Sequence, residues 1–234
     1  MAELTKLPFV SILTPTYNRR LFISQYLKYV RNQDYRGRLE VLVADDGEDS
    51  VADLFYSDET IRYIRLDKRM PLGYKRNLLA SEAKGHILVH MDDDDYYPPN
   101  RVSHAVTKLL SSEKLIAGAS QCYFYNLMEE KITVSGPFGN NHATCGTFAY
   151  FKEYAKTHGF DDHVFGQEEP VFTKNFSEPM VQLNPLSTML VMQHRNNTWD
   201  KANTTTKPTN HKLQDFIKSN DDRRFYRRLV KSIG

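Results

Sequence analysis

Short apolar runs alternate with amphipathic stretches along the first 110 residues of the chain. The apolar runs, which are rich in β-branched residues, lie at 9–14, 39–45, 61–66 and 86–91. Runs of this length and composition predict strands that are buried on both faces. Helices are predicted after these runs, at 20–32, 50–56, 73–84 and 99–112. This alternation predicts βαβ units, and therefore an α/β fold with a mainly parallel central sheet.

The second half of the chain has a less regular pattern. We expect strands within 115–135, at the start of 147–159 and within 181–193. A helix is expected at 168–176, after a loop rich in glycine and asparagine. These elements would complete the same domain, because no internal repeat separates them.

The C-terminal segment differs in composition from the rest of the chain. Residues 204–210, TTTKPTN, indicate a polar linker, and 213–233 read as a basic helix. Residues 201–234 hold nine Lys and Arg against three Asp, a balance of +6, although the whole chain carries only +2. The preceding body is therefore mildly acidic. We expect a domain over 1–203 and a linker with a basic C-terminal helix over 204–234.

Composition excludes several classes of protein. The 234 residues are 40% hydrophobic and 26% charged, which is ordinary for a globular chain and argues against wholesale disorder. No apolar run approaches the roughly 20 residues that cross a bilayer, and the N-terminus lacks a secretory pattern. Two cysteines, Cys122 and Cys145, are too few for a disulfide scaffold. We expect a soluble protein in a reducing compartment, with a cytoplasmic location.

Polar segments follow three of the predicted strands directly. They are PTYNRR from residue 15, DDGEDS from residue 45 and DDDDYYPP from residue 92. The carboxyl ends of parallel strands meet at one edge of the sheet, which is where such folds bind ligands. These three segments are therefore expected to converge on one site.

The third of these segments gathers four carboxylates, Asp92 to Asp95. Adjacent carboxylates repel one another, and a divalent cation with a preference for oxygen ligands would compensate them. A solvated acidic turn that precedes a helix is the alternative. The position at the end of a buried strand favours a site for Mg²⁺ or Mn²⁺ that also binds phosphate groups.

Several motifs in order resemble family 2 glycosyltransferases of the GT-A fold. They are PTYNRR, VLVADDG, PLGYKRNLLASEAKGHILVHMDDDDYYPPNRV and GQEEPVF. Each motif is weak alone, but together they cover roughly residues 8–200 in the expected order. The resemblance implies a Rossmann-like three-layer sandwich, and an enzyme that moves a sugar from a nucleoside-diphosphate sugar, most often a UDP-sugar.

The resemblance also implies a set of residues that bind the donor. Some would hold the nucleotide: Pro15, Thr16, Tyr17, Asp46 and, as a less favoured choice, Asp45. Others would lie near the diphosphate and sugar: Lys75, Arg76, Asn77, Asp92 and Asp94. Guanidinium and ammonium groups suit phosphate oxygens. Plain turns and a solvated helix face are the alternatives for these segments.

The metal ligands implied by the same resemblance are Asp94 and Asp95, with His194 as a further contact. Asp93 is expected to be a neighbour of this site. The cation, Mn²⁺ or Mg²⁺, would stabilise negative charge on the departing diphosphate.

Glu169 takes the position of the family's catalytic base, where Asp is usual, and Glu168 precedes it. The resemblance implies that Glu169 removes the proton of an acceptor hydroxyl during a single displacement that inverts the anomeric centre. Glu168 would orient the acceptor or its loop. A cluster of acids at the start of a helix is the structural alternative.

Two other functions stay open from the residues alone. A sugar nucleotidyltransferase would need a glycine-rich phosphate loop, which TPTYNRR lacks. A module that binds a nucleotide sugar without turnover would not need Glu169.

The expected partners are the nucleotide-sugar donor and a hydroxyl-bearing acceptor, which could be a glycan, a lipid-linked sugar or a protein. The basic tail could be a solvated helix or a contact with an anionic membrane surface. It contains no nucleic-acid-binding motif, so no nucleic acid is expected. The oligomeric state is not indicated by the sequence.

Overall fold

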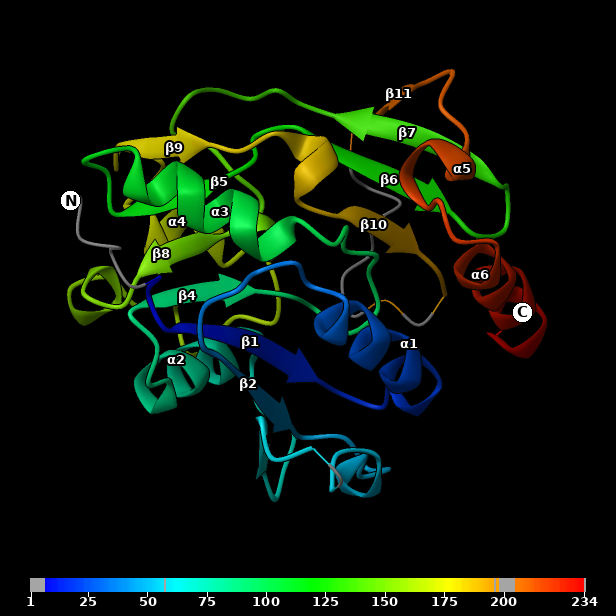
Figure 1. The fold of residues 1–234 in the computed structure, drawn as a ribbon, viewed down its shortest axis with the longest axis horizontal. Coiled ribbons are helices and arrows are strands. Elements are labelled where there is room, and N and C mark those ends of the chain that lie inside the picture. Colours follow the sequence, from blue (N-terminus) through cyan, green and yellow to red (C-terminus); the bar gives the residue numbers. More distant parts are fainter. Residues whose placement is uncertain (1–6, 57, 196, 198–204, 234) are drawn as a thin grey trace.

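The computed structural model describes residues 7–56, 58–195, 197 and 205–233 (Figure 1). Its α-helices are α1 (Arg20–Arg31), α2 (Leu72–Glu82), α3 (Arg101–Leu110), α4 (Glu169–Phe172), α5 (Leu213–Phe216) and α6 (Asn220–Ile233). Its 3₁₀ turns are η1 (Ala52–Leu54), η2 (Cys145–Thr147), η3 (Tyr154–Lys156) and η4 (Pro185–Ser187). Three of the four helices expected in the first half are present, whereas the stretch at 50–56 forms only η1.

In the described part of the chain, the larger sheet has seven strands in the order β3-β2-β1-β4-β8-β5-β9. These strands are β1 (Val10–Thr16), β2 (Leu39–Asp45), β3 (Ile61–Arg65), β4 (Ile87–His90), β5 (Ile116–Gly118), β8 (Ala149–Phe151) and β9 (Met180–Gln182). The first four strands along the chain are mutually parallel, as predicted. Strand β8 is antiparallel to both of its neighbours, β4 and β5. The sheet is therefore mixed but mostly parallel.

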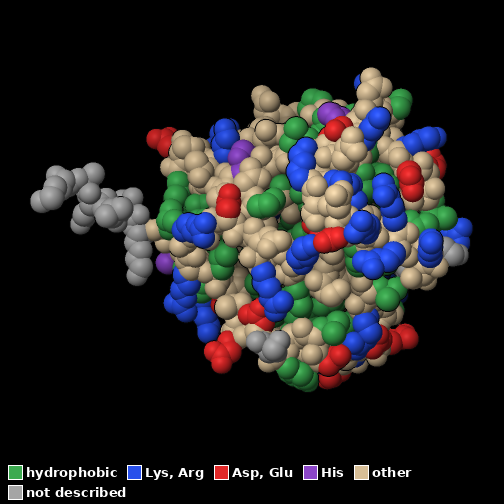
Figure 2. All heavy atoms as spheres, turned by 45° about the vertical axis from the view of Figure 1, so that its right-hand side comes forward, with side chains coloured by type: hydrophobic (Ala, Val, Ile, Leu, Met, Phe, Trp, Pro, Cys, Tyr) green, Lys and Arg blue, Asp and Glu red, His purple; other side chains and the backbone are tan. Residues whose placement is uncertain are grey.

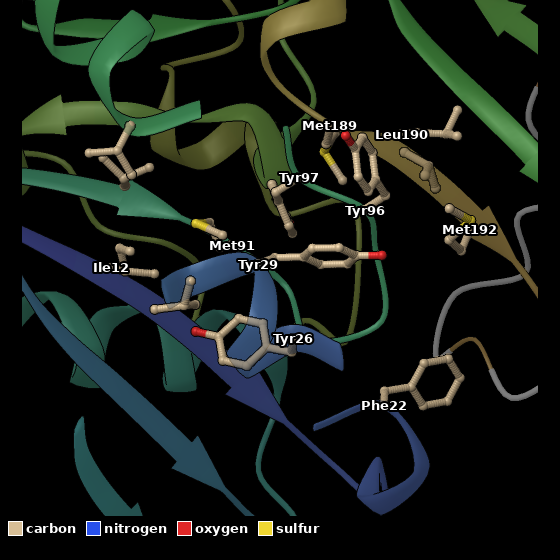
Figure 3. Packing of buried hydrophobic residues seen from close by; sticks show 14 of the residues in the cluster. Ile12, Phe22, Tyr26, Tyr29, Met91, Tyr96, Tyr97, Met189, Leu190 and Met192 are labelled. Carbon is tan, nitrogen blue, oxygen red and sulfur yellow. The ribbon is translucent and has the colours of Figure 1, made fainter. Parts of the chain in front are cut away.

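Helices cover both faces of this sheet, which gives three layers (Figure 1). Alternate residues of β1 point to opposite faces, so that Ile12 joins the hydrophobic cluster with α1 and α3, and Leu13 joins the cluster with α2. Figure 3 shows the first cluster, where Tyr26 and Tyr29 of α1 meet residues that follow β4. The rings of Tyr29 and Tyr96 pack edge to face, with centroids 5.1 Å apart. Burial on both faces explains why the strands read as continuous apolar runs.

A second sheet of four strands lies beside the first in the described residues, in the order β10-β6-β7-β11. Its strands are β6 (Cys122–Asn126), β7 (Lys131–Ser135), β10 (Leu190–Gln193) and β11 (Lys207–Pro208). Strand β11 falls within the predicted linker and pairs antiparallel with β7. The predicted boundary between 203 and 204 lies outside the described residues.

The C-terminal segment folds back against α1. The helix expected over 213–233 is divided into α5 and α6, and Asp222 of α6 accepts hydrogen bonds from Gln25 at 2.9 Å and Lys28 at 2.5 Å. Tyr226 and Leu229 are buried in the same cluster as the core of the sheet. Figure 2 shows Lys and Arg side chains gathered on the face that carries this end of the chain. None of the helices in the described ranges combines the length and the apolar character that a membrane crossing requires.

The helix expected at 168–176 is shorter than predicted, because α4 ends at Phe172. Lys174, Asn175 and Phe176 all have positive φ values, of 48°, 57° and 59°. Three successive left-handed residues cannot continue a right-handed helix.

Candidate active site

The three polar segments meet at the carboxyl edge of the larger sheet. Strand β1 lies between β2 and β4, with Thr16 paired to Asp45 and Leu13 paired to His90. A cavity of about 120 Å³ opens at this edge. Its lining includes these predicted donor and metal residues: Pro15, Thr16, Tyr17, Asp46, Lys75, Arg76, Asp92, Asp94 and Asp95. The acidic turns that are far apart in the sequence are therefore brought to one cavity.

Asp46 and Lys75 form a buried ion pair in the wall of this cavity. The Nζ atom of Lys75 lies 2.6 Å from Asp46 Oδ1 and donates to the carbonyl oxygen of Thr16 at 3.1 Å. The backbone N–H of Met70 donates to Asp46 Oδ2 at 2.7 Å. Burial lowers the pKa of Lys75, an effect that the charge of Asp46 opposes. The pair links β1, β2 and α2 at the site.

Asp45 is close in sequence but has a different environment. It accepts hydrogen bonds from the backbone N–H groups of Gly47 at 2.8 Å and Val51 at 3.1 Å, and from the Tyr63 hydroxyl at 2.5 Å. A Cβ atom on Gly47 would lie 2.7 Å from the backbone nitrogen of Asn18, so this turn requires glycine. Asp45 is completely buried and is not part of the cavity lining. Its carboxylate stabilises the turn that presents Asp46.

The four aspartates after β4 have four different environments. Asp94 Oδ2 lies 3.1 Å from His194 Nε2, and accepts from Arg19 Nε and Asn197 Nδ2, each at 3.3 Å. Asp95 accepts from the backbone N–H of Met192 at 2.7 Å. Burial, together with the neighbouring charge of Asp94, raises the pKa of Asp93 to about 8.

Asp92, the first of the four, pairs with Arg76 of α2. The guanidinium donates to both oxygens of Asp92, at 3.1 and 3.2 Å, while its Nε donates to Glu168 Oε1 at 2.8 Å. Arg76 is only 3% exposed, so these charge-assisted bonds are made away from water. One side chain thereby connects the acidic run to the loop before α4.

A second cavity, of about 600 Å³, adjoins the first. The two share Leu72, Arg76, Asp92 and Asp95 in their linings. Both predicted catalytic residues, Glu168 and Glu169, line the second cavity. The two acids at the start of α4 therefore line the same cavity as Asp92 and Asp95 of the acidic run, and Arg76 belongs to the lining of both cavities.

Glu169 is held by a backbone donor from another loop. The N–H of Cys145, at the start of η2, donates to Glu169 Oε1 at 2.9 Å. Burial and the adjacent charge of Glu168 raise the pKa of Glu169 to about 7, although the Cys145 bond and Arg76 act in the opposite direction. A carboxylate with such a pKa can accept a proton near neutral pH.

His90 and Arg101 support the loop that carries Cys145. Arg101 is fully buried and donates to the carbonyl oxygens of Thr147 and Phe148, each at 2.9 Å, and of His90 at 3.2 Å. Burial and the nearby guanidinium groups lower the pKa of His90, so that its imidazole is neutral. These contacts fix η2 relative to the end of β4.

Asn77 follows Arg76 directly in α2 and is outside the lining of either cavity. Its side chain donates to the carbonyl oxygen of Phe160 at 2.8 Å and to Asp162 at 2.7 Å, and accepts from the Phe160 N–H at 2.8 Å. These bonds attach the segment before Glu168 to α2.

Three further polar residues line the first cavity that the sequence analysis did not single out: Arg19, Arg69 and Asn197. Arg19 belongs to the PTYNRR segment and Asn197 follows His194 by three residues, so the motifs contained them without distinguishing them. Arg69 lies over the ring of Tyr17, with 4.4 Å from its guanidinium carbon to the ring centroid. No periodic signal marks residues in such loops.

The side chains at Asp94 fit a divalent cation that is completed by a ligand. In the described ranges, no three His, Cys, Asp or Glu side chains are grouped to hold a metal ion by themselves. The 3.1 Å between Asp94 Oδ2 and His194 Nε2 matches the ~3 Å spacing of adjacent ligands on an ion bound at about 2.1 Å. Mg²⁺ sites commonly use one or two carboxylates together with substrate phosphates.

The model of the family described as Glycosyl transferase family 2 matches residues 11–172, which is more than half of the chain. The chain belongs to glycosyl transferase family 2. The match extends from β1 through the acidic run to the end of α4. It therefore includes the charged residues between Asp46 and Glu169 that line the two cavities. The family expected from the motifs is confirmed.

Two curated bacterial proteins are similar in sequence. One, GalNAc(5)-diNAcBac-PP-undecaprenol beta-1,3-glucosyltransferase of Campylobacter jejuni, is 30% identical over 139 residues, or 56% of this chain and 42% of its own length. The other, putative colanic acid biosynthesis glycosyl transferase WcaA of Escherichia coli, is 34% identical over 101 residues, or 41% of this chain and 36% of its own. The chain therefore matches less than half the length of these relatives.

Solved structures show the same fold. TarS 1-349 of S. aureus in complex with UDP-GlcNAc has a TM-score of 0.65 at 17% identity, covering 81% of this chain and 60% of that one. The mannosyltransferase PcManGT of Pyrobaculum calidifontis, in complex with GDP-Man and Mn²⁺, has a TM-score of 0.62 at 19% identity, covering 80% and 57%. The predicted α/β fold of the GT-A type is confirmed.

Proposed function

We propose that this chain is an inverting glycosyltransferase that moves a sugar from a nucleoside-diphosphate sugar to a hydroxyl group. The observation that carries the proposal is the pair of adjoining cavities, one lined by the Asp46, Lys75 and acidic-run residues and the other by Glu169. A reaction between two bound substrates needs two sites with a common boundary. Family membership supports the same reaction class.

The donor is assigned to the first cavity. Pro15, Thr16, Tyr17 and Asp46 would contact the nucleoside, while Lys75 and Arg76 provide positive charge for the diphosphate. Solved relatives of the fold bind UDP-GlcNAc and GDP-Man, which supports a nucleotide sugar and leaves the base to experiment. A UDP-sugar is the first donor to test.

A divalent cation, Mn²⁺ or Mg²⁺, is assigned to Asp94 and His194, with Asp95 adjacent. Mn²⁺ accompanies the nucleotide sugar in the Pyrobaculum structure, and the spacing of the two side chains in this chain suits such an ion. When bound, the cation stabilises the charge of the leaving diphosphate. Arg19 and Asn197, which contact Asp94, would orient that carboxylate.

Glu169 is assigned the role of general base. In the reaction the acceptor oxygen forms a bond to the anomeric carbon while the bond to the diphosphate breaks, and the electron pair leaves with the diphosphate. The proton of the hydroxyl goes to Glu169, whose pKa of about 7 suits this transfer. Attack from the face opposite the leaving group inverts the anomeric centre. Glu168, paired with Arg76, would position the base and the acceptor.

The exposed basic face of α6 is assigned a contact with an anionic membrane surface. Four exposed side chains form it: Arg224, Arg227, Arg228 and Lys231. The apolar face of this helix is buried against α1, so the contact would be electrostatic, at about 1 kcal/mol for each basic residue. The Campylobacter relative is named for an undecaprenol-linked substrate, which supports an acceptor presented at a membrane.

Vesicle sedimentation tests this contact. We expect binding to phosphatidylglycerol vesicles but not to phosphatidylcholine vesicles, with loss of binding in high salt. The double variant Arg227→Glu with Arg228→Glu should stay in the supernatant. A matched control is Lys84→Glu with Lys108→Glu, two exposed residues elsewhere. Equal sedimentation of both double variants would refute the assignment.

The reaction itself is tested by measuring nucleoside diphosphate release from a panel of UDP-, GDP- and dTDP-sugars, with Mn²⁺, with Mg²⁺ and with chelator. Release that depends on the cation, together with thermal stabilisation by the same nucleoside diphosphate, is the expected result. A sugar nucleotidyltransferase would instead release pyrophosphate from a nucleoside triphosphate and a sugar phosphate. Stabilisation without any turnover would identify a binding module and contradict the proposal.

A further inference from the structure

The lining of the second cavity combines aromatic rings with the carboxylates of Glu168 and Glu169. The rings of Phe138, His142 and Phe176 form part of its lining. They belong to two loops, one after β7 and the other after α4. This wall is outside the donor cavity and has no part in the chemistry assigned above.

The three rings are in contact in a row, in which one pair is stacked and the other is tilted. His142 and Phe176 are stacked, with centroids 4.4 Å apart and planes inclined by 23°. Phe138 and His142 have centroids 4.7 Å apart at 51°. Phe138 is 57% exposed, so this row of three rings extends from the cavity to solvent. Burial lowers the pKa of His142, which therefore offers a neutral ring rather than a cation.

The backbone attaches this wall to the catalytic segment. Thr173 Oγ1 donates to the carbonyl oxygen of Glu169 at 2.7 Å and accepts from the N–H of Phe176 at 3.1 Å. The N–H of Asn175 donates to the carbonyl oxygen of Pro170 at 2.6 Å. One compact turn therefore sets the position of the Phe176 ring relative to the proposed base.

This turn is strained. Lys174, Asn175 and Phe176 are left-handed, a conformation that is unfavourable for residues with a Cβ atom. Strain of this kind persists where surrounding structure imposes it, often at functional sites. Here its effect is to present Phe176 to the cavity instead of continuing α4 as a helix.

The second loop is also constrained. Gly136 has a φ of 80°, and a Cβ atom at this position would lie 2.1 Å from the carbonyl oxygen of Ser120. Gln182 donates to the carbonyl oxygens of Asn140 at 2.8 Å and His142 at 3.0 Å. Both halves of the aromatic wall are thus built on fixed backbone.

The chemistry of the cavity matches a saccharide. A pyranose ring has faces of C–H groups that pack on aromatic rings, and hydroxyl groups around its edge that need polar partners. The cavity offers both aromatic rings and carboxylates in its lining, within a volume of about 600 Å³. A lone serine or threonine side chain would leave the exposed rings without a contact.

We propose that Phe138, His142 and Phe176 form an acceptor subsite for a sugar ring, so that the acceptor is a saccharide whose hydroxyl is directed to Glu169. This inference rests on the proposed glycosyltransferase function. It assigns the aromatic rings to binding of the acceptor rather than to the donor or the chemical step.

The test compares Phe138→Ala and Phe176→Ala with the matched control Tyr56→Ala, which removes an 83% exposed ring outside both cavities. Methyl pyranosides and short oligosaccharides serve as acceptors. In the two loop variants we expect KM for the saccharide to rise about tenfold, and the ratio of transfer to donor hydrolysis to fall correspondingly. Phe176→Tyr keeps an aromatic ring, so its KM for the saccharide and its ratio of transfer to hydrolysis should equal those of the wild type. Thermal unfolding checks that each variant is folded.

Saturation-transfer NMR with the same methyl pyranosides gives a readout that does not need turnover. Ring C–H protons should receive saturation from the wild type and from Tyr56→Ala, and lose it with Phe176→Ala. Unchanged transfer kinetics and unchanged NMR contacts in both loop variants would overturn the subsite. So would a wild type that hydrolyses a donor but neither binds nor uses any saccharide, a result that leaves the proposed function standing. Absence of nucleotide binding and of donor turnover would instead count against the proposed function, while the NMR contacts still report on the subsite.

Discussion

The backbone N–H of Cys145 donates a hydrogen bond to Glu169 Oε1 at 2.9 Å, which joins the loop after β7 to the start of α4. The bond engages one of the two carboxylate oxygens of Glu169, a residue that lines the second cavity. It also opposes the rise in pKa that burial causes. Glu169 thus combines a fixed orientation with a proton affinity suited to neutral pH.

Replacement of Glu169 by Gln should remove the base while keeping the size of the side chain. A general base contributes about 10²–10⁴-fold to rate, and we expect kcat to fall within that range. Donor affinity, measured by thermal shift with the nucleoside diphosphate, should persist because the donor cavity does not include this residue. The control Glu113→Gln alters an exposed carboxylate on the surface. A Glu169→Gln enzyme with the kcat of the wild type would refute the assignment.

The pH dependence of kcat/KM should report the ionisation of Glu169. The base acts when deprotonated, so activity should rise with pH and level off above about 7, where the folded protein loses this proton. A glutamate with an ordinary pKa would instead make activity rise with pH near 4.5. The pH profile of the Glu169→Gln variant should lack the limb near 7, and a limb that persists there would have to belong to another group.

Folding stability should show the same ionisation with the opposite slope. The folded-state pKa of Glu169 is raised above the ordinary value of 4.5, so between 4.5 and about 7 the folded state binds more protons than the unfolded state. The free energy of unfolding therefore falls as pH rises through this window. Urea unfolding measures the free energy of unfolding at pH 5 and at pH 7.5. The change in this free energy between the two pH values should be smaller for Glu169→Gln than for the wild type. An equal or larger difference would contradict the raised pKa.

Asp94 and His194 should be needed for donor binding that depends on the cation. We expect Asp94→Asn and His194→Ala to weaken binding of the nucleoside diphosphate in Mn²⁺, and to bring it near the value that the wild type shows with chelator. The measurement is isothermal titration with and without Mn²⁺. Asp49→Asn, an exposed carboxylate on the loop after β2, is the control. If His194→Ala keeps the full effect of Mn²⁺, His194 is not a ligand.

Arg76 should not be replaceable by Lys. Its three N–H donors to Asp92 and Glu168 form a planar fork that an ammonium group cannot reproduce. We expect Arg76→Lys to lower both the melting temperature and kcat/KM, because one buried carboxylate loses its partner. Arg62→Lys, at a surface pair with Glu82, should stay within about 0.5 kcal/mol of the wild type. Equal stability of the two variants would show that the buried fork is unimportant.

The sequence predicted the first half of the fold because each buried strand is a local apolar run bounded by turn residues. Strand β8 could not be assigned its antiparallel direction, because its partners β4 and β5 are set by contacts between distant segments. The helix expected at 168–176 ends early because Lys174 to Phe176 adopt left-handed conformations. None of these three residues is a glycine, so the sequence did not predict this end of the helix. The basic C-terminal helix was visible from its composition, whereas its docking through Asp222 and Tyr226 depends on α1.

The motifs singled out charged residues that the structure brings to one cavity, Asp46 after β2 and Lys75 and Arg76 in α2. Their roles in binding a donor stay a prediction. Spacing alone could not distinguish Asp46 from Asp45. Only the structure shows that the Asp45 carboxylate accepts hydrogen bonds from backbone N–H groups of its own turn. Arg19 and Asn197 contact Asp94 from loops that carry no periodic signal.

Asn77 gives a direct test of whether a residue in the motif binds the donor or supports the fold. Its amide makes three hydrogen bonds to the segment 160–162 and it lies outside both cavities. We expect Asn77→Ala to lower the free energy of unfolding by about 0.5–1.5 kcal/mol, because the partly buried N–H and carbonyl groups of Phe160 lose their partner. KM for the donor should change little at a temperature where the variant is folded. A large rise in donor KM without loss of stability would place Asn77 in the donor site, as the resemblance implied.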